Sequence, residues 1–158
     1  MNIFKKYLLV FLVSMVPLFE LRYTMLTLVP VLNVNYAIAY TVGILGNMLP
    51  VPFIYLFARR ILEWGRDKRF IGKFFNWCLI KGEKGGKKLQ NTAGKGLYFA
   101  LFLFVGIPLP GTGAWTGTLA ASILDLDFKK TIVAVMAGVI FAGLIMLALS
   151  FGLFDVIF

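Results

Sequence analysis

A break that contains prolines and glycines divides the second half of this chain into two apolar runs, each too short to cross a membrane. The break, which holds Pro108 and Pro110, lies between the runs 97–107 and 114–124 of 11 residues each. A helix rises 1.5 Å per residue, so about 20 residues are needed to span a hydrocarbon core of about 30 Å. Two half-length helices that meet at such a break predict a re-entrant hairpin, which enters and leaves the membrane by the same face. The alternative is one spanning helix with a kink at the prolines.

Composition places the chain in a membrane. Of its 158 residues, 60% are hydrophobic and 15% are charged, whereas soluble domains are nearer half apolar and a quarter charged. The net charge of +9 would also suit a nucleic-acid partner, but 11 of the 16 lysines and arginines lie between Arg59 and Lys95. A basic cluster between apolar segments is typical of a cytoplasmic loop. We therefore expect an integral membrane protein that binds no nucleic acid.

Residue types that many enzymes need are absent from the sequence. It holds no histidine, and Cys78 is its only cysteine. Ser-His triads, His-ligated zinc sites, histidine proton relays and intrachain disulfides are therefore excluded. We predict a protein that is not an enzyme and that uses neither a metal nor another cofactor.

The first half begins with a second pair of short apolar segments. Residues 7–19 follow a basic Lys5-Lys6 start, as in a signal peptide, but no small-x-small cleavage site follows, so we expect the segment to be retained. A polar break at 17–22, which Pro17 opens, separates it from a short helix at 23–32. The pattern predicts another hairpin of half-length helices.

Two further stretches are long enough to cross a membrane. Tyr36–Ala58 holds 23 residues without charge, and Thr131–Phe154 holds 24. About 20 residues are enough for a span. Pro50 and Pro52 predict a kink or local unwinding in the first of these two helices.

A basic, amphipathic segment at 61–95 joins the two halves. Within Phe70–Leu79, apolar residues recur in pairs four residues apart, which is the spacing of a helical stripe, and basic residues surround them. The pattern predicts a helix that lies in the membrane interface against anionic lipid; a helix packed on the protein's own cytoplasmic face fits it equally well. Glycine and lysine are frequent in 81–94, for which we predict a flexible, solvated loop.

The two halves match at an offset of 92 residues. Leu32–Tyr36 falls on Leu124–Phe128, and Gly46 falls on Gly138. The two polar breaks coincide as well, so each half is predicted to be a hairpin, a polar turn and a spanning helix. Internal repeats with short, Gly/Pro-broken segments at matching positions are the best sequence pointer to a transporter-type site at the membrane midplane.

These patterns predict one all-α membrane domain over residues 1–158. An inverted repeat of a re-entrant helical hairpin plus a transmembrane helix occupies 3–60 and 96–158, and a cytoplasmic basic linker occupies 61–95. This topology places 13 lysines and arginines inside and 2 outside, and four spans with both termini inside give the same numbers, so charge does not choose between them. We prefer the re-entrant topology because it brings both hairpin tips to the midplane.

Glu20 and Arg22 are the only charged residues in the hydrophobic body of the first hairpin. Ionisable groups inside a membrane are costly and usually face the protein interior or a water-filled cavity. Arg22 offers a planar fork that suits phosphate or carboxylate. Glu20 can take up a proton when it is desolvated, because burial disfavours its anion. The alternative is that the two side chains pair with each other or reach the membrane surface.

The break in the second half offers uncharged donors. It opens the helix predicted at 114–124, whose free N–H groups and dipole favour an anion. Its glycines let that backbone approach a ligand closely, and nearby threonines add hydroxyls, while Asn47, near Pro50 in the first span, is a weaker contributor. The candidate substrate-binding residues are Arg22, Asn47, Gly111, Thr112, Gly113 and Thr116, with Glu20 as the proton-coupling residue and Pro17, Pro108 and Pro110 as the hairpin breaks.

Two motifs resemble the signatures of a known family. Pro17-Leu18-Phe19-Glu20-Leu21-Arg22 and the stretch Gly106–Gly117 look like those of the prokaryotic small multi-drug export membrane protein family, which is similar to the DedA/VTT superfamily. The resemblance implies a multi-pass protein of the prokaryotic cytoplasmic (inner) membrane with inverted re-entrant hairpins, in which Glu20 is the membrane acid and Arg22 a nearby essential base. The chain is shorter than standard DedA members and lacks their arginine-rich motif after the second hairpin.

Three functions are consistent with these features. The first is a DedA-like, proton-coupled transporter or flippase for an anionic lipid-phosphate or similar amphipathic substrate. The second is an exporter of cationic drugs in which Glu20 accepts both the substrate and a proton. The third is a membrane-assembly protein without transport activity. Membrane lipid and protons are the expected partners, and a homodimer is an option because two spans and two hairpins make a thin wall for a cavity.

Overall fold

The computed structural model describes the backbone of residues 1–17 and 19–157, and their side chains apart from those at 78, 81, 82, 85, 86, 88–90, 92 and 153–157. Every regular element within these residues is helical. In chain order they are α1 (Ile3–Met15), α2 (Glu20–Tyr23), the π-helix η1 (Thr24–Leu28), α3 (Val29–Leu32), α4 (Tyr36–Met48), α5 (Pro50–Gly65), α6 (Gly72–Ala93), α7 (Gly96–Gly106), α8 (Ala114–Ile123) and α9 (Phe128–Ile157).

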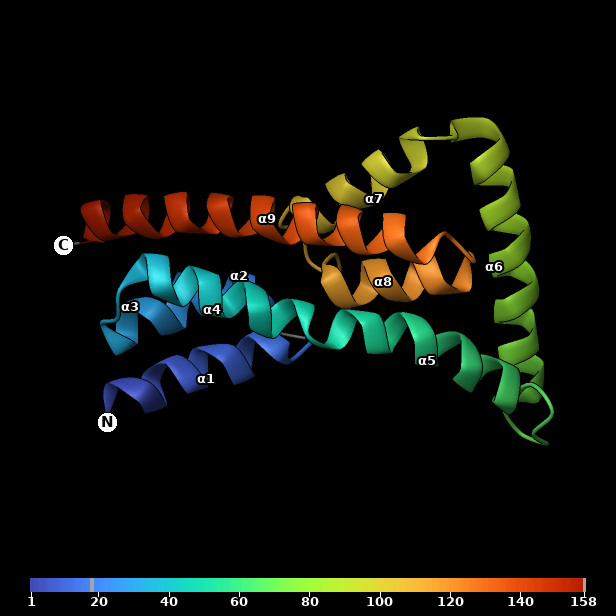
Figure 1. Ribbon diagram of the computed structural model, residues 1–158, viewed down its shortest axis with the longest axis horizontal. Helices are drawn as coiled ribbons and strands as arrows, with labels where there is room; N and C mark the ends of the chain where they lie inside the picture. The colour runs from blue at the N-terminus through green and yellow to red at the C-terminus, as the bar shows by residue number, and fades with distance from the viewer. Residues whose placement is uncertain (18, 158) are drawn as a thin grey trace.

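Two helical hairpins point toward each other from opposite ends of the molecule (Figure 1). In the first hairpin, α1 runs to the middle of the molecule, and α2, η1 and α3 return to the end where the chain begins. In the second, α7 runs to the middle and α8 returns to the opposite end. The pair α4–α5 and the long helix α9 run antiparallel along the molecule, and α6 lies across the end opposite the two termini.

Two helical stretches are long and apolar enough to cross a membrane. Tyr36–Gly65, which joins α4 and α5, holds 30 residues, and Phe128–Gly152 of α9 holds 25. The regular helix is interrupted at Leu49, directly before Pro50, which cannot donate a backbone hydrogen bond, although Leu49 itself keeps helical angles (φ −57°, ψ −46°). By contrast, α7 and α8 hold 11 and 10 residues, or about 15 Å each. The protein is therefore an all-α membrane protein.

The polar turns before α4 and α9 share one geometry. Asn33 and Asp125 both have a positive φ, +49° and +56°, a conformation that Asn and Asp tolerate better than other side chains. Two residues later, Asn35 Oδ1 accepts a hydrogen bond from Ala37 N at 3.0 Å, and Asp127 Oδ1 accepts one from Lys130 N at 2.9 Å. Both helices thus begin with a side-chain N-cap of the same kind.

Glycines allow the first helix of each hairpin to approach a spanning helix closely. A Cβ at Gly46 of α4 would collide with the carbonyl oxygen of Phe11 in α1. A Cβ at Gly138 of α9 would lie 2.9 Å from the carbonyl oxygen of Phe102 in α7 and 2.7 Å from Val105 Cβ. Because backbone atoms are involved in both cases, a larger residue at either position would push the two helices apart.

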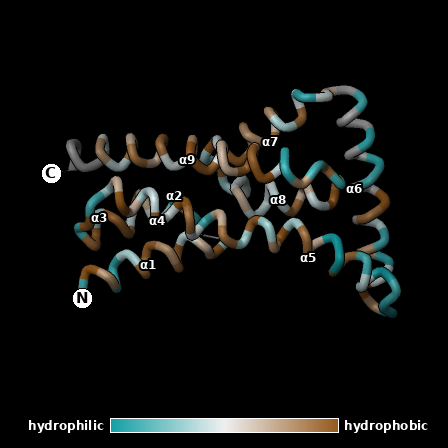
Figure 2. Tube along the Cα trace, viewed as in Figure 1, coloured by the Kyte–Doolittle hydropathy of each residue, from teal (hydrophilic) through white to brown (hydrophobic). Residues whose placement is uncertain are grey.

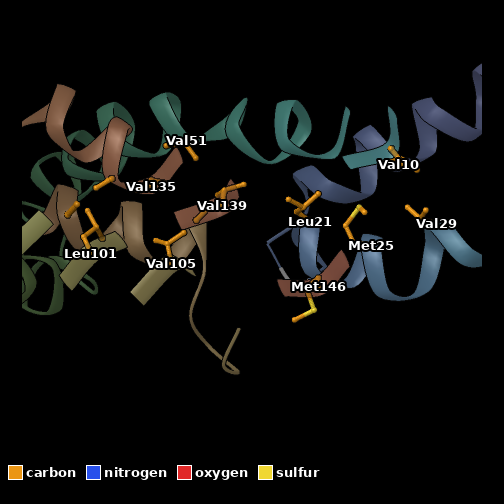
Figure 3. Packing of buried hydrophobic residues seen from close by; sticks show 14 of the residues in the cluster. Val10, Leu21, Met25, Val29, Val51, Leu101, Val105, Val135, Val139 and Met146 are labelled. Carbon is orange, nitrogen blue, oxygen red and sulfur yellow. The ribbon is translucent and has the colours of Figure 1, made fainter. Parts of the chain in front are cut away.

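The buried apolar residues follow the two hairpins along α9 (Figure 3). One end of the core contains side chains of α1–α3 together with Met146 of α9, and the other end contains side chains of α7 together with earlier residues of α9. The residues labelled in Figure 3 are Val10, Leu21, Met25, Val29 and Met146 at the first end, and Leu101, Val105, Val135, Val139 and Val51 of α5 at the second. Each hairpin is therefore held mainly by its own packing against α9 and α4–α5.

Two sequence predictions about local structure are wrong. Residues 81–94 are not a loop, since α6 continues to Ala93. Glu83 in this stretch accepts a hydrogen bond from Arg59 Nη2 at 2.5 Å, which ties the second half of α6 to α5. In the first hairpin, the helix already resumes at Glu20, so the break is shorter than predicted and Glu20 and Arg22 lie in a helical turn.

The structure supports one of the two alternatives for the basic segment, a helix packed on the protein's own face, while its place in the membrane interface stays a prediction. The side chain of Leu79 is buried and Phe75 packs against Gly65 of α5, so one face of α6 rests on the protein. Phe74 and Trp77 are 62% and 57% exposed on the same helix. The side chain of Cys78, part of the predicted stripe, lies outside the described residues. Figure 2 shows hydrophilic residues concentrated on α6 and the adjoining end of α5, whereas the other helices are largely hydrophobic.

Candidate functional site

A groove of about 490 Å³ lies where the tips of the two hairpins meet; we call it the tip groove. It is bounded by the break after α1, by α2 and η1, by the break between α7 and α8, by the first turn of α8, and by one side chain of α9. Its lining residues are Pro17, Phe19, Glu20, Arg22, Tyr23, Leu26, Pro108, Leu109, Pro110, Gly111, Thr112, Trp115, Thr116 and Met146. Residues of both predicted motifs therefore come together.

The carboxylate of Glu20, a residue of α2, lies beside the N-terminus of helix α8. Glu20 is only 6% exposed, and its Oε1 accepts a long hydrogen bond of 3.4 Å from the backbone N of Trp115. Gly113, at the helix N-cap, has a φ of +152°, and a Cβ there would collide with both carboxylate oxygens. The chain's own carboxylate thus sits at the helix N-terminus, where free N–H groups and the helix dipole favour negative charge.

The guanidinium of Arg22, also a residue of α2, lies beside the C-terminus of helix α7 and donates hydrogen bonds to three carbonyl groups. Nη2 donates to Val105 O at 2.5 Å, and Nη1 donates to Leu109 O at 3.1 Å and to Thr112 O at 2.9 Å. Nη1 also lies 3.0 Å from Thr112 Oγ1. The prolines of the break have no N–H group and the helix ends before them, so carbonyls of the last turn lack helical donors. Arg22 supplies donors in their place.

Glu20 and Arg22 therefore each bind the second hairpin rather than each other. Glu20 and Arg22, both within the described residues, form no ion pair with each other. The anion lies at a helix N-terminus and the cation at a helix C-terminus, which is the favourable arrangement with respect to both helix dipoles. Trp115 adds a third link between the tips, because its Nε1 donates to Met15 O at 2.9 Å. Together these contacts hold the two tips against each other.

The other predicted residues fall into two groups. Gly111, Thr112 and Thr116 line the tip groove, and Thr116 Oγ1 donates weakly to Gly113 O at 3.4 Å. Asn47 is buried in α4 at 2% exposure, is not a lining residue of the groove, and its Oδ1 has no hydrogen-bond partner among the described residues. The three predicted hairpin breaks, Pro17, Pro108 and Pro110, all line the groove.

Sequence reasoning missed the aromatic wall of the tip groove. Phe19 and Tyr23 lie side by side with ring centroids 4.9 Å apart, and Trp115 lines the groove from the other hairpin. A signal was present for all three, since each is next to or within one of the two motifs. Met146 carries no such signal, because only the packing of α9 against the first hairpin brings it to the groove.

The matched family covers most of the chain. Residues 20–145 match a family model whose description is "Putative small multi-drug export protein". The match begins at Glu20 and includes residues from both sides of the tip groove. Three lining residues lie outside it: Pro17, Phe19 and Met146. No curated protein and no solved structure matches the chain. The resemblance to this family is therefore confirmed, while the link to the DedA/VTT superfamily stays a prediction. The chain belongs to the small multi-drug export protein family.

Proposed function

We propose that this protein exports amphipathic organic cations, that their binding site is the tip groove, and that Glu20 exchanges each cation for a proton. The observation that carries the proposal is a buried carboxylate, without an ion pair among the described residues, in a groove with aromatic walls. The family description, small multi-drug export, supports the same function.

The chemistry of the tip groove favours a cationic substrate. Its volume of about 490 Å³ falls within the range of sites for small organic ligands. Aromatic faces attract organic cations, and Phe19, Tyr23 and Trp115 provide three such rings beside Glu20. Arg22 does not offset the carboxylate by pairing with it, because its guanidinium is engaged by carbonyl oxygens of the second hairpin.

Proton exchange follows from the surroundings of Glu20. An ionised carboxylate inside a membrane protein is costly unless a cation or hydrogen-bond donors balance it. Its observed donor, the Trp115 N–H, is long at 3.4 Å. When no organic cation occupies the groove, a proton on the carboxyl group removes a charge that the Trp115 N–H and the dipole of α8 balance only in part. When a cation arrives, it replaces that proton, so that the two species alternate at one site.

The arrangement of the helices supports a site at the membrane midplane. We infer that both hairpins are re-entrant and that the two halves form an inverted repeat. The half-length of α7 and α8, the opposite directions of the hairpins in Figure 1 and the matching turns at Asn33 and Asp125 support this inference. Broken helices that meet at the midplane are how many transporters build a site open to either face.

Charge supports an orientation in the prokaryotic inner membrane. The basic cluster lies on α6 and the adjoining end of α5, at one end of the molecule, and basic loops favour the cytoplasm. Both termini lie at the other end. The proposal is therefore a multi-pass protein with α6 in the cytoplasm and with its two ends on the outer side.

One observation favours a second candidate, a DedA-like transporter of lipid phosphates. Glu20 Oε1 accepts a hydrogen bond from the Trp115 backbone N at the start of α8, a position that favours an anion, and Arg22 lies nearby on the same tip. If Glu20 turned away, the phosphate of an amphipathic substrate could take the place of its carboxylate at this helix N-terminus. In this version Glu20 is a competitor of the substrate rather than its ligand.

A transport assay with two substrates separates the candidates. Proteoliposomes with a pH gradient would be given tetraphenylphosphonium, a lipophilic cation, or a short-chain fluorescent phosphatidic acid. For cation export, Glu20→Gln abolishes proton-driven movement of tetraphenylphosphonium, because the amide binds neither proton nor cation, while the exposed control Asp67→Asn retains it. Unchanged cation transport by Glu20→Gln would overturn the proposal. Phosphatidic acid transport that increases in Glu20→Gln would instead establish the second candidate.

Arg22→Ala is a poor test of substrate binding. Arg22 holds three carbonyl groups of the second hairpin, so its removal opens the tips whichever substrate is bound. Glu20 is the better residue to change, because Gln keeps its size and one oxygen acceptor for the Trp115 N–H.

A further inference from the structure

A second groove lies between α7 and α9, at the end of the molecule where α6 crosses it. Its volume is about 1060 Å³. Three lysines line it, Lys95 at the start of α7 and Lys129 and Lys130 in the first turn of α9. We call it the lysine groove; it shares no lining residue with the tip groove.

The three ammonium groups have no carboxylate partner within 4 Å among the described residues. Two acidic residues also line the lysine groove: Asp125 Oδ1 lies 3.2 Å from Arg59 Nη1, whereas Asp127 keeps its charge and accepts a hydrogen bond from the Lys130 backbone N. In the part of the chain that the structure describes, no ion pair includes Lys95, Lys129 or Lys130. With three lysines and two aspartates in its lining, and with Asp125 paired to Arg59, the groove carries a net positive charge.

An apolar strip continues from the lysines along α9. Val133 and Ala137, one and two turns after Lys129, line the groove, and Phe99 of α7 faces it from the other side. Val133 is 69% exposed and Phe99 is 61% exposed, so the strip is uncovered. Each turn of helix advances about 5.4 Å, so Val133 and Ala137 lie about one and two turns beyond Lys129. The cationic part of the groove is therefore followed by an apolar part, in the same order as the head group and acyl chain of a lipid.

Helix α6 places the lysines near the membrane surface. It lies across the end of the molecule (Figure 1) and carries the exposed aromatic residues Phe74 and Trp77, in a segment rich in lysine and arginine. Aromatic and basic side chains of this kind are typical of the membrane–water interface. Lys95 follows the end of α6 within two residues, so it lies at the same level, and the apolar strip lies deeper.

We propose that the lysine groove binds one anionic phospholipid of the surrounding leaflet, with its phosphate at Lys95, Lys129 and Lys130 and an acyl chain along Phe99, Val133 and Ala137. The charge and the apolar strip favour this occupant over a zwitterionic lipid or a free anion, because only an anionic lipid satisfies both parts of the groove. The lipid would join α7 to α9 and thus hold the second hairpin from its open end. This site is separate from the proposed transport site.

Native mass spectrometry of the full-length protein in detergent tests the proposal. The protein would be titrated with phosphatidylglycerol, phosphatidylcholine or water-soluble glycerol 1-phosphate, and bound molecules counted. We expect one phosphatidylglycerol to bind more tightly than the rest, with phosphatidylcholine and glycerol 1-phosphate at least tenfold weaker. Lysine near anionic lipid contributes roughly fivefold each, so the triple variant Lys95→Gln/Lys129→Gln/Lys130→Gln should bind roughly 100-fold less tightly.

Matched variants separate the groove from general surface charge. Arg69→Gln/Lys84→Gln/Lys87→Gln removes three exposed charges at the same end, outside the groove, and should leave the tight site intact. Ala137→Phe fills the apolar strip and should weaken binding, whereas Met136→Phe, the neighbouring exposed position, should not. Equal loss in the two triple variants, or equal binding of the two lipids, would overturn the proposal. Glu20→Gln should keep the lipid, so failure of the transport proposal would leave this result unaffected.

Discussion

Glu20 carries its carboxylate on a strained backbone. Its φ is +50°, in the left-handed region that costs a residue with a Cβ about 1–2 kcal/mol. Strain of this kind persists only where the surrounding structure enforces it, and it is frequent at functional sites. The chain reverses direction between α1 and α2, and the Glu20 side chain reaches the backbone of Trp115 in the other hairpin. At the residue scale, the strained backbone of the first tip directs the Glu20 carboxylate toward the second hairpin.

Two glycines of the second tip provide a matched test of that presentation. Gly113 and Gly111 both have a positive φ, +152° and +80°, so alanine costs about 1–3 kcal/mol of backbone strain at either position. Only at Gly113 would the new Cβ collide with the Glu20 carboxylate, since nothing lies within 4 Å of one at Gly111. We expect Gly113→Ala to be less thermally stable than Gly111→Ala, because its Cβ also displaces the Glu20 carboxylate, and we expect cation transport per folded molecule to fall at least tenfold in Gly113→Ala alone. Equal transport by the two variants would contradict this role of Gly113.

At the scale of helices, local pattern predicted most of the elements but not where two of them begin or end. The lengths of α7 and α8 follow from Pro108, Pro110 and the apolar runs beside them, because proline and glycine end a helix locally. The second half of α6 could not be predicted in this way. Its composition suits a loop, and the helix there is held by the contact of Glu83 with Arg59, which is 24 residues away.

Close packing of α9 against α7 gives a prediction for stability. In Gly138→Ala, the added methyl group would lie 2.7 Å from Val105 Cβ and 2.9 Å from the Phe102 carbonyl oxygen. Neither atom can move without moving α7, so we expect a loss of about 1–3 kcal/mol. Gly152→Ala on the same helix meets nothing within 4 Å and should gain up to about 1 kcal/mol from helix propensity. Thermal unfolding in detergent micelles measures both, and equal stabilities would show that α7 and α9 are not in close contact.

At the scale of the whole molecule, the two hairpins meet because α4–α5 and α9 run in opposite directions between them (Figure 1). This places α6 at one end and both termini at the other. Charge counting could not distinguish this topology from four spans with both termini in the cytoplasm, since both place the same number of basic residues inside. The direction of each hairpin is a tertiary property, and it carries the proposal of a re-entrant, inverted repeat.

Cysteine labelling tests the topology directly. In a Cys78→Ser background, Lys5→Cys reports on the beginning of the chain and Arg69→Cys on the turn before α6. We expect a membrane-impermeant maleimide to label Lys5→Cys in intact cells, and Arg69→Cys only after the cells are opened, because the basic end should face the cytoplasm. Protection of both positions in intact cells would favour four spans and would contradict the re-entrant topology.

The sequence by itself determined the helical class, the membrane location, the hairpin lengths and the identity of the two charged tip residues. These follow from apolar run length, from proline and glycine and from the cost of charge in a membrane, all of which act locally along the chain. Only the tertiary structure decided what the charges bind. Arg22 reaches carbonyls 83 to 90 residues away and Glu20 a backbone N–H 95 residues away. No local pattern encodes those partners. They become available only when the end of α7 and the start of α8 are packed beside the tip of the first hairpin.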